Sequence, residues 1–255
     1  MPGNEVDVAL FLFRNLHKLT LPHLGIVDEV GFPSSGPSKY SICIREEDLS
    51  RLSSDDSRKK ADIYVNGKGI SIKQKGSQFD LNRLQRAEME ELFKTVGISD
   101  IKEVIDKLEF EVRRFHTTKG IPRDRPWRDS FSEEDFYKLL EYLMMKGSPN
   151  VGISKHPAEY VMEAPTRISS GRDIDVYTFK EYFDKYKDHF KVSIRRSWLG
   201  QKSGSEHGRA RSLISKPGNL PFVFDTVSGK PNTGWREEWP KDARRTAYYL
   251  MLSKV

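Results

Sequence analysis

The sequence has 255 residues, of which 36% are hydrophobic and 11% aromatic, enough for a packed globular core. Its longest purely apolar run, Val8 to Phe13, is far shorter than the ~20 residues of a membrane-spanning helix, and no secretory signal pattern appears. We therefore expect a cytoplasmic protein with no membrane partner. The single cysteine excludes a disulfide framework, and the lack of Gly-x-x-x-x-Gly-Lys-Ser/Thr excludes an ATP-driven motor on this sequence.

The first predicted elements are a helix over residues 4–16 and a strand over residues 40–44. The helix begins with Asn4 as a cap and with acidic residues in its first turn, followed by a dense apolar run. The strand contains the single cysteine, Cys43, which we interpret as a core residue.

A β-hairpin is predicted over residues 60–74. Apolar residues alternate on its two arms, and Asn66-Gly67-Lys68-Gly69 supplies a tight turn between them. Side chains alternate with a period of two, so Asp62 and Tyr64 share one face with Ser71 and Lys73. Asp62 lies opposite Ser71 if the turn is Asn66-Gly67, and opposite Lys73 if the turn is one residue later.

A carboxylate next to a backbone carbonyl makes a hard oxygen site that suits Mg²⁺. Lys73 would then lie close to the attacking water and could offset charge on a phosphate under in-line attack. This arrangement is typical of phosphodiester hydrolysis. The alternative is a cross-strand Asp–Lys pair on a solvated face, which would contribute only ~0.2–1 kcal/mol and have no chemical role.

The hairpin resembles the signature of the PD-(D/E)xK nucleases, with Ala61-Asp62 followed by Ser71-Ile72-Lys73. Ala61 replaces a common proline, and Ser71 replaces the usual acid, as in some compact Type II restriction endonucleases. The resemblance implies that Asp62 and the Ile72 carbonyl bind Mg²⁺, that Ser71 orients a water and that Lys73 assists the attacking water. It covers roughly residues 4–95, and the serine leaves the number of metal ions open.

The same resemblance implies a glutamate on a helix ahead of the hairpin. Glu5 is the matching residue, with Glu29, Glu46 and Glu47 as alternatives. The helix dipole alone would also favour an acid at position 5.

After the hairpin, the apolar spacing predicts helices over residues 78–93, with Asp80 as the cap, and over residues 99–115. Residues 116–130 carry Gly and Pro without an apolar period and are predicted to form a loop. Two further helices are predicted over residues 133–146 and 179–189.

The C-terminal region is predicted to be basic and rich in β-structure, with strands over 191–199 and 221–224 and a polar loop between them. Residues 189–216 hold seven Lys and Arg and one acid, Glu206, and so account for the whole net charge of +6. Such a concentration indicates a polyanionic partner. The residues expected to contact DNA are Arg195, Arg196, Gln201, Lys202, Ser203, Arg209 and Arg211.

We therefore predict an α/β fold, with a central mixed β-sheet flanked by helices as in restriction endonucleases. One domain would span residues 1–255, with a catalytic core (1–115), a helical region (116–188) and a DNA-recognition region (189–255). The predicted function is Mg²⁺-dependent cleavage of double-stranded DNA by a Type II restriction endonuclease, paired with a DNA methyltransferase. The resemblance implies a homodimer, although compact members can bind as monomers. The alternatives are a repair or junction nuclease of the same fold and a non-catalytic, sequence-specific DNA-binding protein.

Overall fold

The computed structural model describes residues 4–34, 39–51, 59–118, 120–149, 151–198 and 246–255. The chain divides into two compact units, each built from two separate stretches of sequence. The first unit comprises residues 1–79 and 140–188, and the second comprises residues 80–139 and 189–255. Within the described part of the chain, no helix is both long and apolar enough to span a membrane.

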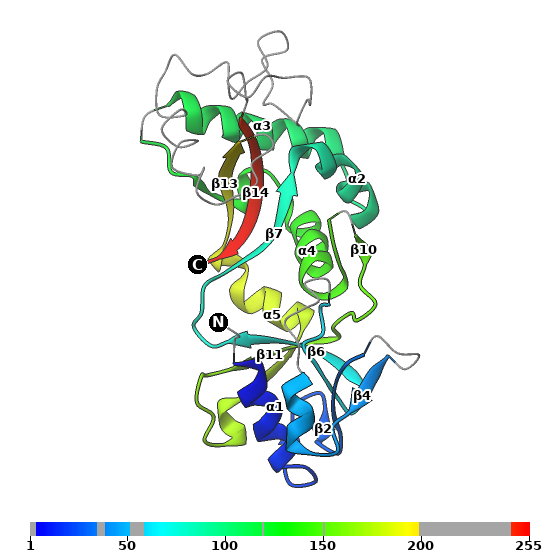
Figure 1. Cartoon of the computed structure of the whole chain (residues 1–255). Helices are drawn as coiled ribbons and strands as arrows, with labels where there is room; N and C mark the ends of the chain where they lie inside the picture. The colour runs from blue at the N-terminus through cyan, green and yellow to red at the C-terminus, as the bar shows by residue number, and fades with distance from the viewer. Residues whose placement is uncertain (1–3, 35–38, 52–58, 119, 150, 199–245) are drawn as a thin grey trace. The chain divides into compact units, whose positions relative to one another are not determined.

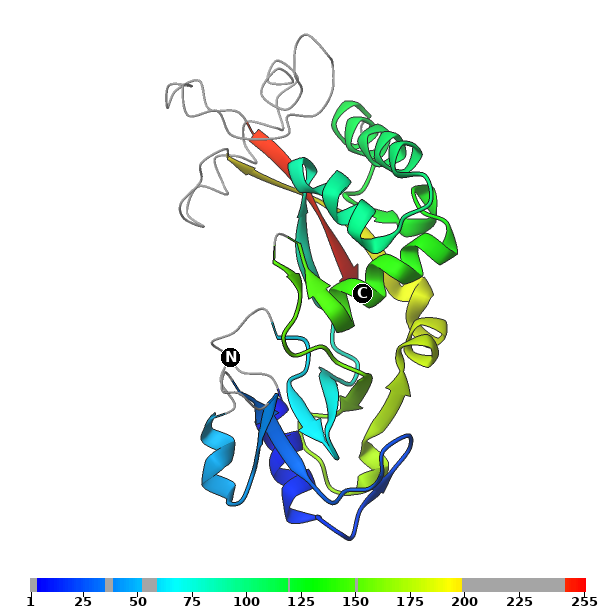
Figure 2. The same ribbon diagram turned by 90° about the vertical axis from the view of Figure 1, so that its right-hand side faces the viewer.

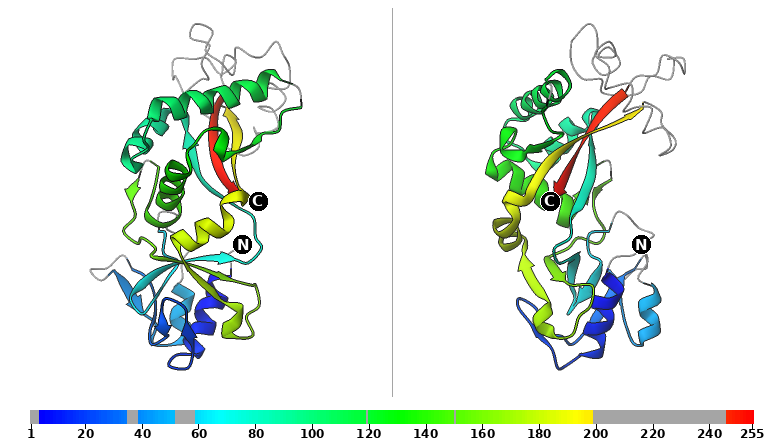
Figure 3. Two further views of the ribbon diagram at one scale, coloured as in Figure 1. Left: turned by 180° about the vertical axis from the view of Figure 1, so that it is seen from behind. Right: turned by 90° about the vertical axis from the view of Figure 1, so that its left-hand side faces the viewer.

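The first unit is built on a six-stranded sheet with the order β12-β11-β6-β5-β3-β4. Strands β6 and β11 run parallel, whereas the other neighbours are antiparallel, so the sheet is mixed. Figures 1 and 3 show α1 on one side of this sheet and α5 on the other. The main elements are α1 (Glu5–Arg14), β3 (Val30–Pro33), β4 (Tyr40–Ile42), β5 (Ile63–Val65), β6 (Lys68–Gln74), β11 (Tyr160–Ala164), β12 (Asp175–Thr178) and α5 (Phe179–Tyr186).

Short elements complete this unit. They are the two-stranded pairs β1 (Thr20–Leu21) with β2 (Gly25–Ile26) and β9 (Gly147–Ser148) with β10 (Gly152–Ile153), 3-10 turns at Glu46–Arg51, Gly171–Asp173 and Lys187–His189, and a π-helix at Tyr142–Lys146.

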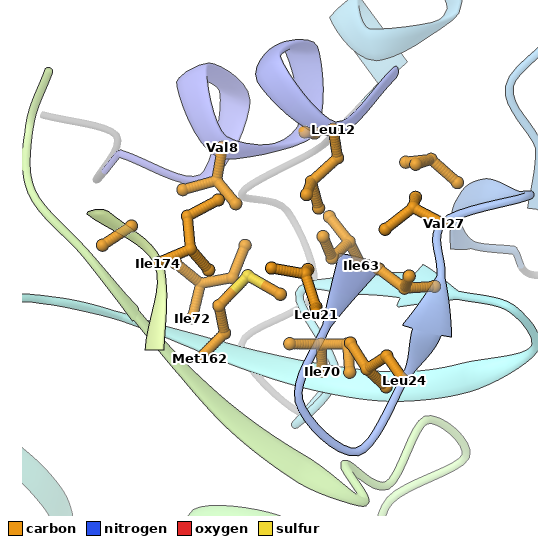
Figure 4. Close-up of a cluster of buried hydrophobic side chains, with 14 of the residues drawn as sticks. Val8, Leu12, Leu21, Leu24, Val27, Ile63, Ile70, Ile72, Met162 and Ile174 are labelled. Carbon is orange, nitrogen blue, oxygen red and sulfur yellow. The ribbon is translucent and has the colours of Figure 1, made fainter. Parts of the chain in front are cut away.

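The core of the first unit lies between α1 and the sheet. Val8 and Leu12 on the buried face of α1 meet Ile63, Ile70 and Ile72 from the hairpin strands (Figure 4). Burying each such side chain is worth about 1.5–3 kcal/mol. This packing selects the apolar face of the hairpin and leaves Asp62 and Lys73 on the other face. Cys43 is 5% exposed and belongs to the same core, as the sequence predicted.

The second unit is built on a four-stranded sheet with the order β7-β14-β13-β8. Figure 2 shows α2, α3 and α4 on one side of this sheet. Its elements are β7 (Phe79–Gln85), α2 (Arg86–Val96), α3 (Ile101–Thr117), β8 (Asp124–Pro126), a 3-10 turn (Trp127–Asp129), α4 (Glu133–Glu141), β13 (Phe190–Trp198) and β14 (Thr246–Lys254). The α/β class, with a central mixed sheet flanked by helices, is therefore confirmed.

Two local predictions differ from the structure. The helix predicted over residues 78–93 is wrong in its first half, because residues 79–85 form β7 and α2 begins only at Arg86. The spacing of Leu81 and Leu84 fits a helical turn, but pairing with β14 draws this segment into the sheet. The loop predicted over residues 116–130 contains β8, which pairs with β13. The region 116–188, predicted to be helical, also contains β11 and β12 of the central sheet.

The turn of the hairpin gives a first testable prediction. Asn66 and Gly67 both have positive φ, 51° and 75°, and the Asn66 side chain bonds four backbone groups, the amides of Asp28 and Glu29 and the carbonyls of Leu24 and Ile26. We expect Asn66→Ala to lower the free energy of unfolding by about 2–4 kcal/mol, because these bonds are lost and the turn is strained. Gly67→Ala strains the backbone and brings its Cβ to 3.3 Å from the Tyr40 hydroxyl, but it keeps the Asn66 bonds and should cost only about 1 kcal/mol. Urea unfolding would measure both, and equal effects would contradict the bracing role of Asn66.

Cys43 gives a second prediction. Burial, and then the Asp48 carboxylate, raise the pKa of its thiol to about 11. At pH 8 only about one thiol in a thousand would be ionised, compared with roughly one in four for a free cysteine. We therefore expect Ellman's reagent to label the native protein at least about 100-fold more slowly than the urea-unfolded protein. Equal labelling rates would show that this core opens freely.

Candidate active site

The hairpin register places Asp62 directly opposite Ser71. Ile63 pairs with Ile70 and Val65 pairs with Lys68, so the turn is the two-residue Asn66-Gly67. Both of its residues have positive φ, which is the geometry of a type I′ turn and which asparagine and glycine tolerate. Of the two registers that the sequence allowed, the structure therefore has the first.

Asp62 is held at the edge of β5 by a hydrogen bond across the hairpin. Its Oδ2 accepts the backbone N–H of Ile72 at 2.7 Å, and its own N–H donates to the carbonyl of Ile70 at 2.8 Å. Burial raises the pKa of Asp62, while the charge of Lys73 and the Ile72 hydrogen bond oppose that rise. The carboxylate is thus fixed by the backbone and placed where a cation would stabilise its charged form.

Lys73 lies on the face of β6 that also carries Ser71. Its Nζ donates to Ser71 Oγ at 2.8 Å and to the Ile72 carbonyl at 3.1 Å. The ring of Phe79 lies 5.7 Å from the same ammonium. Ser71 is only 2% exposed, so its hydroxyl holds the Lys73 ammonium in place. Lys73 therefore bonds Ser71 directly and shares the Ile72 backbone with Asp62.

Glu5, in the first turn of α1, is near enough to Asp62 and Lys73 for their charges to act on its carboxyl group. The Asn4 side chain, which was predicted to cap the helix, makes no capping bond and donates instead to the Ala164 carbonyl at 2.8 Å. Ala164 ends β11, where it pairs with Gln74 beside Lys73. Burial raises the pKa of Glu5, and the negative charge of Asp62 raises it further, so the two carboxylates repel each other.

The other acids weighed from the sequence are engaged elsewhere or exposed. Glu29 accepts a hydrogen bond from the Tyr40 hydroxyl at 2.7 Å. Glu46 forms a two-point ion pair with Arg14, with both distances 2.8 Å. Glu47 is exposed. Glu5 is therefore the acid whose surroundings fit the site best.

Lys60 is a residue of this site that the sequence analysis missed. It is 9% exposed, and its Nζ donates to the Leu143 carbonyl in the π-helix at 2.7 Å. Burial, and then the charge of Lys73, lower its pKa to about 8. The period-two alternation that placed Asp62 with Lys73 also places Lys60 with Asp62, and so could have found it.

The DNA-contact residues predicted in the C-terminal region are only partly covered by the structure. Arg195 lies on β13, and its guanidinium is 3.6 Å from the Asp80 carboxylate. Arg196 follows it on the same strand, and its side chain lies outside the described residues. So do five predicted contact residues, Gln201, Lys202, Ser203, Arg209 and Arg211.

The oxygen donors of the site can be compared with the needs of Mg²⁺. Asp62, Glu5 and the Ile72 carbonyl supply hard oxygens, and Mg²⁺ commonly uses one or two protein carboxylates and several waters. Within the part of the chain that the structure describes, no group of three or more His, Cys, Asp and Glu could hold a metal. The chemistry of these oxygen donors therefore suits Mg²⁺ with several waters in its shell, as the resemblance implies.

Comparison with known proteins gives little further information. No protein-family model and no curated protein sequence matches this chain. Among solved structures, the restriction endonuclease MspI in complex with its cognate DNA is similar, with 12% sequence identity and a TM-score of 0.31. The similarity covers 82% of this chain and 78% of that one. At this distance no residue role is transferred from MspI to this chain.

Proposed function

We propose that the protein is a Mg²⁺-dependent endonuclease that cleaves double-stranded DNA at a specific sequence, as a Type II restriction endonuclease does. The observation that carries the proposal is the hairpin register, which places Asp62 opposite Ser71 and gives Asp62 and Lys73 a common partner in the Ile72 backbone, with bonds of 2.7 Å and 3.1 Å. A solvated Asp–Lys pair would need neither the buried serine nor the second carboxylate at Glu5.

Each residue has a distinct role in this proposal. Asp62, Glu5 and the Ile72 carbonyl would hold Mg²⁺, which when bound supplies Lewis-acid stabilisation of the phosphate and a more acidic water. Lys73 would orient the attacking water and offset the charge that develops on the phosphate. Ser71 keeps the Lys73 ammonium in place, and the Ile72 amide keeps Asp62 in place.

The test is incubation of the purified protein with a long DNA of known sequence, in Mg²⁺ and in EDTA, followed by gel electrophoresis. Discrete bands that need Mg²⁺ would support site-specific cleavage and allow the site to be mapped. A smear would indicate a repair or junction nuclease. Intact DNA, tested both methylated and unmethylated, would indicate a DNA-binding protein with an inert hairpin.

A further inference from the structure

A network of six polar side chains crosses the four-stranded sheet of the second unit. Following the contacts from one end to the other, its members are Arg195, Asp80, Ser253, Ser193, Asp124 and Arg123. Arg195 and Ser193 lie on β13, Asp80 on β7, Ser253 on β14 and Asp124 on β8. Arg123 directly precedes β8. An arginine therefore stands at each end, each next to an aspartate, and two serines join the aspartates. We call this set the Arg–Asp–Ser network.

The inner part of the network is held by short hydrogen bonds. Ser253 Oγ donates to Asp80 Oδ1 at 2.5 Å, and Ser193 Oγ donates to Asp124 Oδ1 at 2.5 Å. The two serine hydroxyls are 3.3 Å apart. Ser193 and Ser253 are 1% and 5% exposed. Buried hydroxyls therefore fix the two carboxylates in position.

The arginines at the two ends are less tightly held. The Arg195 guanidinium is 3.6 Å from Asp80 Oδ2, and Arg123 Nε is 3.7 Å from Asp124 Oδ1. These distances exceed those of a good charged hydrogen bond, which are about 2.7–2.9 Å. A guanidinium has five N–H donors, so each arginine keeps donors for another anion.

Ser193, Arg195, Ser253 and Asp124 lie on the face of the sheet opposite the helices, and Arg123, directly before the edge strand β8, lies beside Asp124. On β13, Phe190 packs against Phe136 of α4, and Val192 and Ile194 share the side of Phe190 and are buried. Ser193 and Arg195 alternate with these residues and so point the other way. Figure 2 shows the helices on one side of this sheet. The side chains of Asp80, Asp124 and Arg123 remain 43–45% exposed, and that of Arg195 is 22% exposed.

We propose that the Arg–Asp–Ser network is a DNA-contacting surface, in which Arg123 and Arg195 bind duplex DNA and Asp80 and Asp124 position their guanidinium groups. An arginine held beside a fixed carboxylate loses less side-chain freedom on binding and presents its planar fork to a phosphate or a guanine edge. This inference depends on the proposed function, which makes duplex DNA the partner. It adds four positioning residues and Arg123 to the contacts predicted from the sequence.

The competing explanation is that these are ordinary surface ion pairs. The two explanations predict opposite changes in DNA affinity when Asp80 is replaced. If Asp80 only adds a negative charge, Asp80→Asn makes the surface more positive and should tighten DNA binding. If Asp80 positions Arg195, the same substitution should weaken binding despite the gain in charge.

The experiment measures the affinity of the full-length protein for a duplex from the cleavage test, in EDTA and at two salt concentrations. We expect Asp80→Asn and Asp124→Asn to weaken binding about five- to tenfold. Asp106→Asn is the matched control, because Asp106 lies on α3 and pairs with Lys102 there. It should change affinity by less than about twofold. Unchanged or tighter binding by both network variants would overturn the inference.

A second variant keeps the test informative if an aspartate variant fails to fold. Arg195→Lys retains the charge and the pairing with Asp80 but loses the planar fork, so we expect it to bind about fivefold more weakly. Wild-type affinity in this variant would count against the inference. A wild-type protein that binds no duplex at either salt concentration would instead defeat the proposed function itself.

Discussion

Replacing Asp62 with asparagine is expected to reduce DNA cleavage by about a thousandfold or more while DNA binding in EDTA persists. The asparagine carbonyl can still accept the Ile72 amide, so the hairpin keeps its register. What it loses is the negative charge proposed to hold Mg²⁺. Initial cleavage rates and duplex affinity, measured on the same preparation, would separate catalysis from binding.

Stability gives this prediction an independent check. Burial raises the pKa of Asp62 above its unfolded value, so its ionised form opposes folding at neutral pH. The stabilising contribution of protonation is present at low pH and is lost as the pH rises through the folded pKa. The neutral asparagine removes this penalty, so the Tm should stay level or rise. Asp28→Asn, which removes only an exposed pair with His17, is the matched control. If Asp62→Asn cleaved DNA at the wild-type rate, the hairpin could not be the active site.

Replacing Lys73 with methionine is expected to lower the cleavage rate by roughly 10²–10³-fold. Methionine keeps much of the length of the side chain but removes the ammonium that bonds Ser71 Oγ and the Ile72 carbonyl. Because the proposed role of this charge is greatest as the phosphate is attacked, duplex affinity in EDTA should change little. Single-turnover cleavage in excess enzyme is the measurement.

Lys75 provides the matched control for Lys73. It lies two residues further along the same face, and its ammonium pairs with Asp175 at 2.8 Å. Lys75→Met should leave the cleavage rate within about twofold of wild type, because it breaks a partly exposed ion pair. If the two variants lost activity equally, the effect would come from general positive charge and not from the site.

The hairpin could be predicted from the sequence because its information is local. Asn66-Gly67 fixes the turn, and alternation then decides which side chains share a face. Only the choice between two registers needed the structure, and it follows from the positive φ of both turn residues. The apolar face was predictable for the same reason, since Ile63 and Val65 on one arm, and Ile70 and Ile72 on the other, are two residues apart.

Elements that depend on distant partners could not be predicted in the same way. β7 carries a short helix-like spacing, yet it joins a sheet with β14, more than 150 residues later. β11 is five residues long and contains the buried charge of Glu163, whose carboxylate accepts a bond from Tyr186 of α5 at 2.6 Å. Neither β14 as the partner of β7 nor Tyr186 as the partner of Glu163 can be identified from the local sequence pattern. The strand β14 itself was not predicted, although its run of Tyr, Leu and Met is typical of β-structure.

The choice of the acid proposed to complete the site also depended on a distant contact. Glu5 was the matching acid in the sequence, with Glu29, Glu46 and Glu47 as alternatives, and the helix dipole alone could explain an acid at position 5. Glu5 is distinguished by the bond from Asn4 to the end of β11, a contact across 160 residues. The predicted contacts beyond Trp198 and before Thr246 stay predictions, because those residues lie outside the described part of the chain.

The interleaving of the two units has a consequence for synthesis on the ribosome. Residues 1–79 contain the whole hairpin, but β6 gains its parallel neighbour β11 only after residues 160–164 have emerged. The nascent chain would therefore carry the motif on a sheet edge for the time needed to translate about 80 more residues, roughly 4–16 s at typical rates of synthesis. Glu5 likewise lacks its anchor at Ala164 during that interval. The proposed active site therefore stays incomplete until β11 has been translated, so the proposed nuclease would be inactive during that interval.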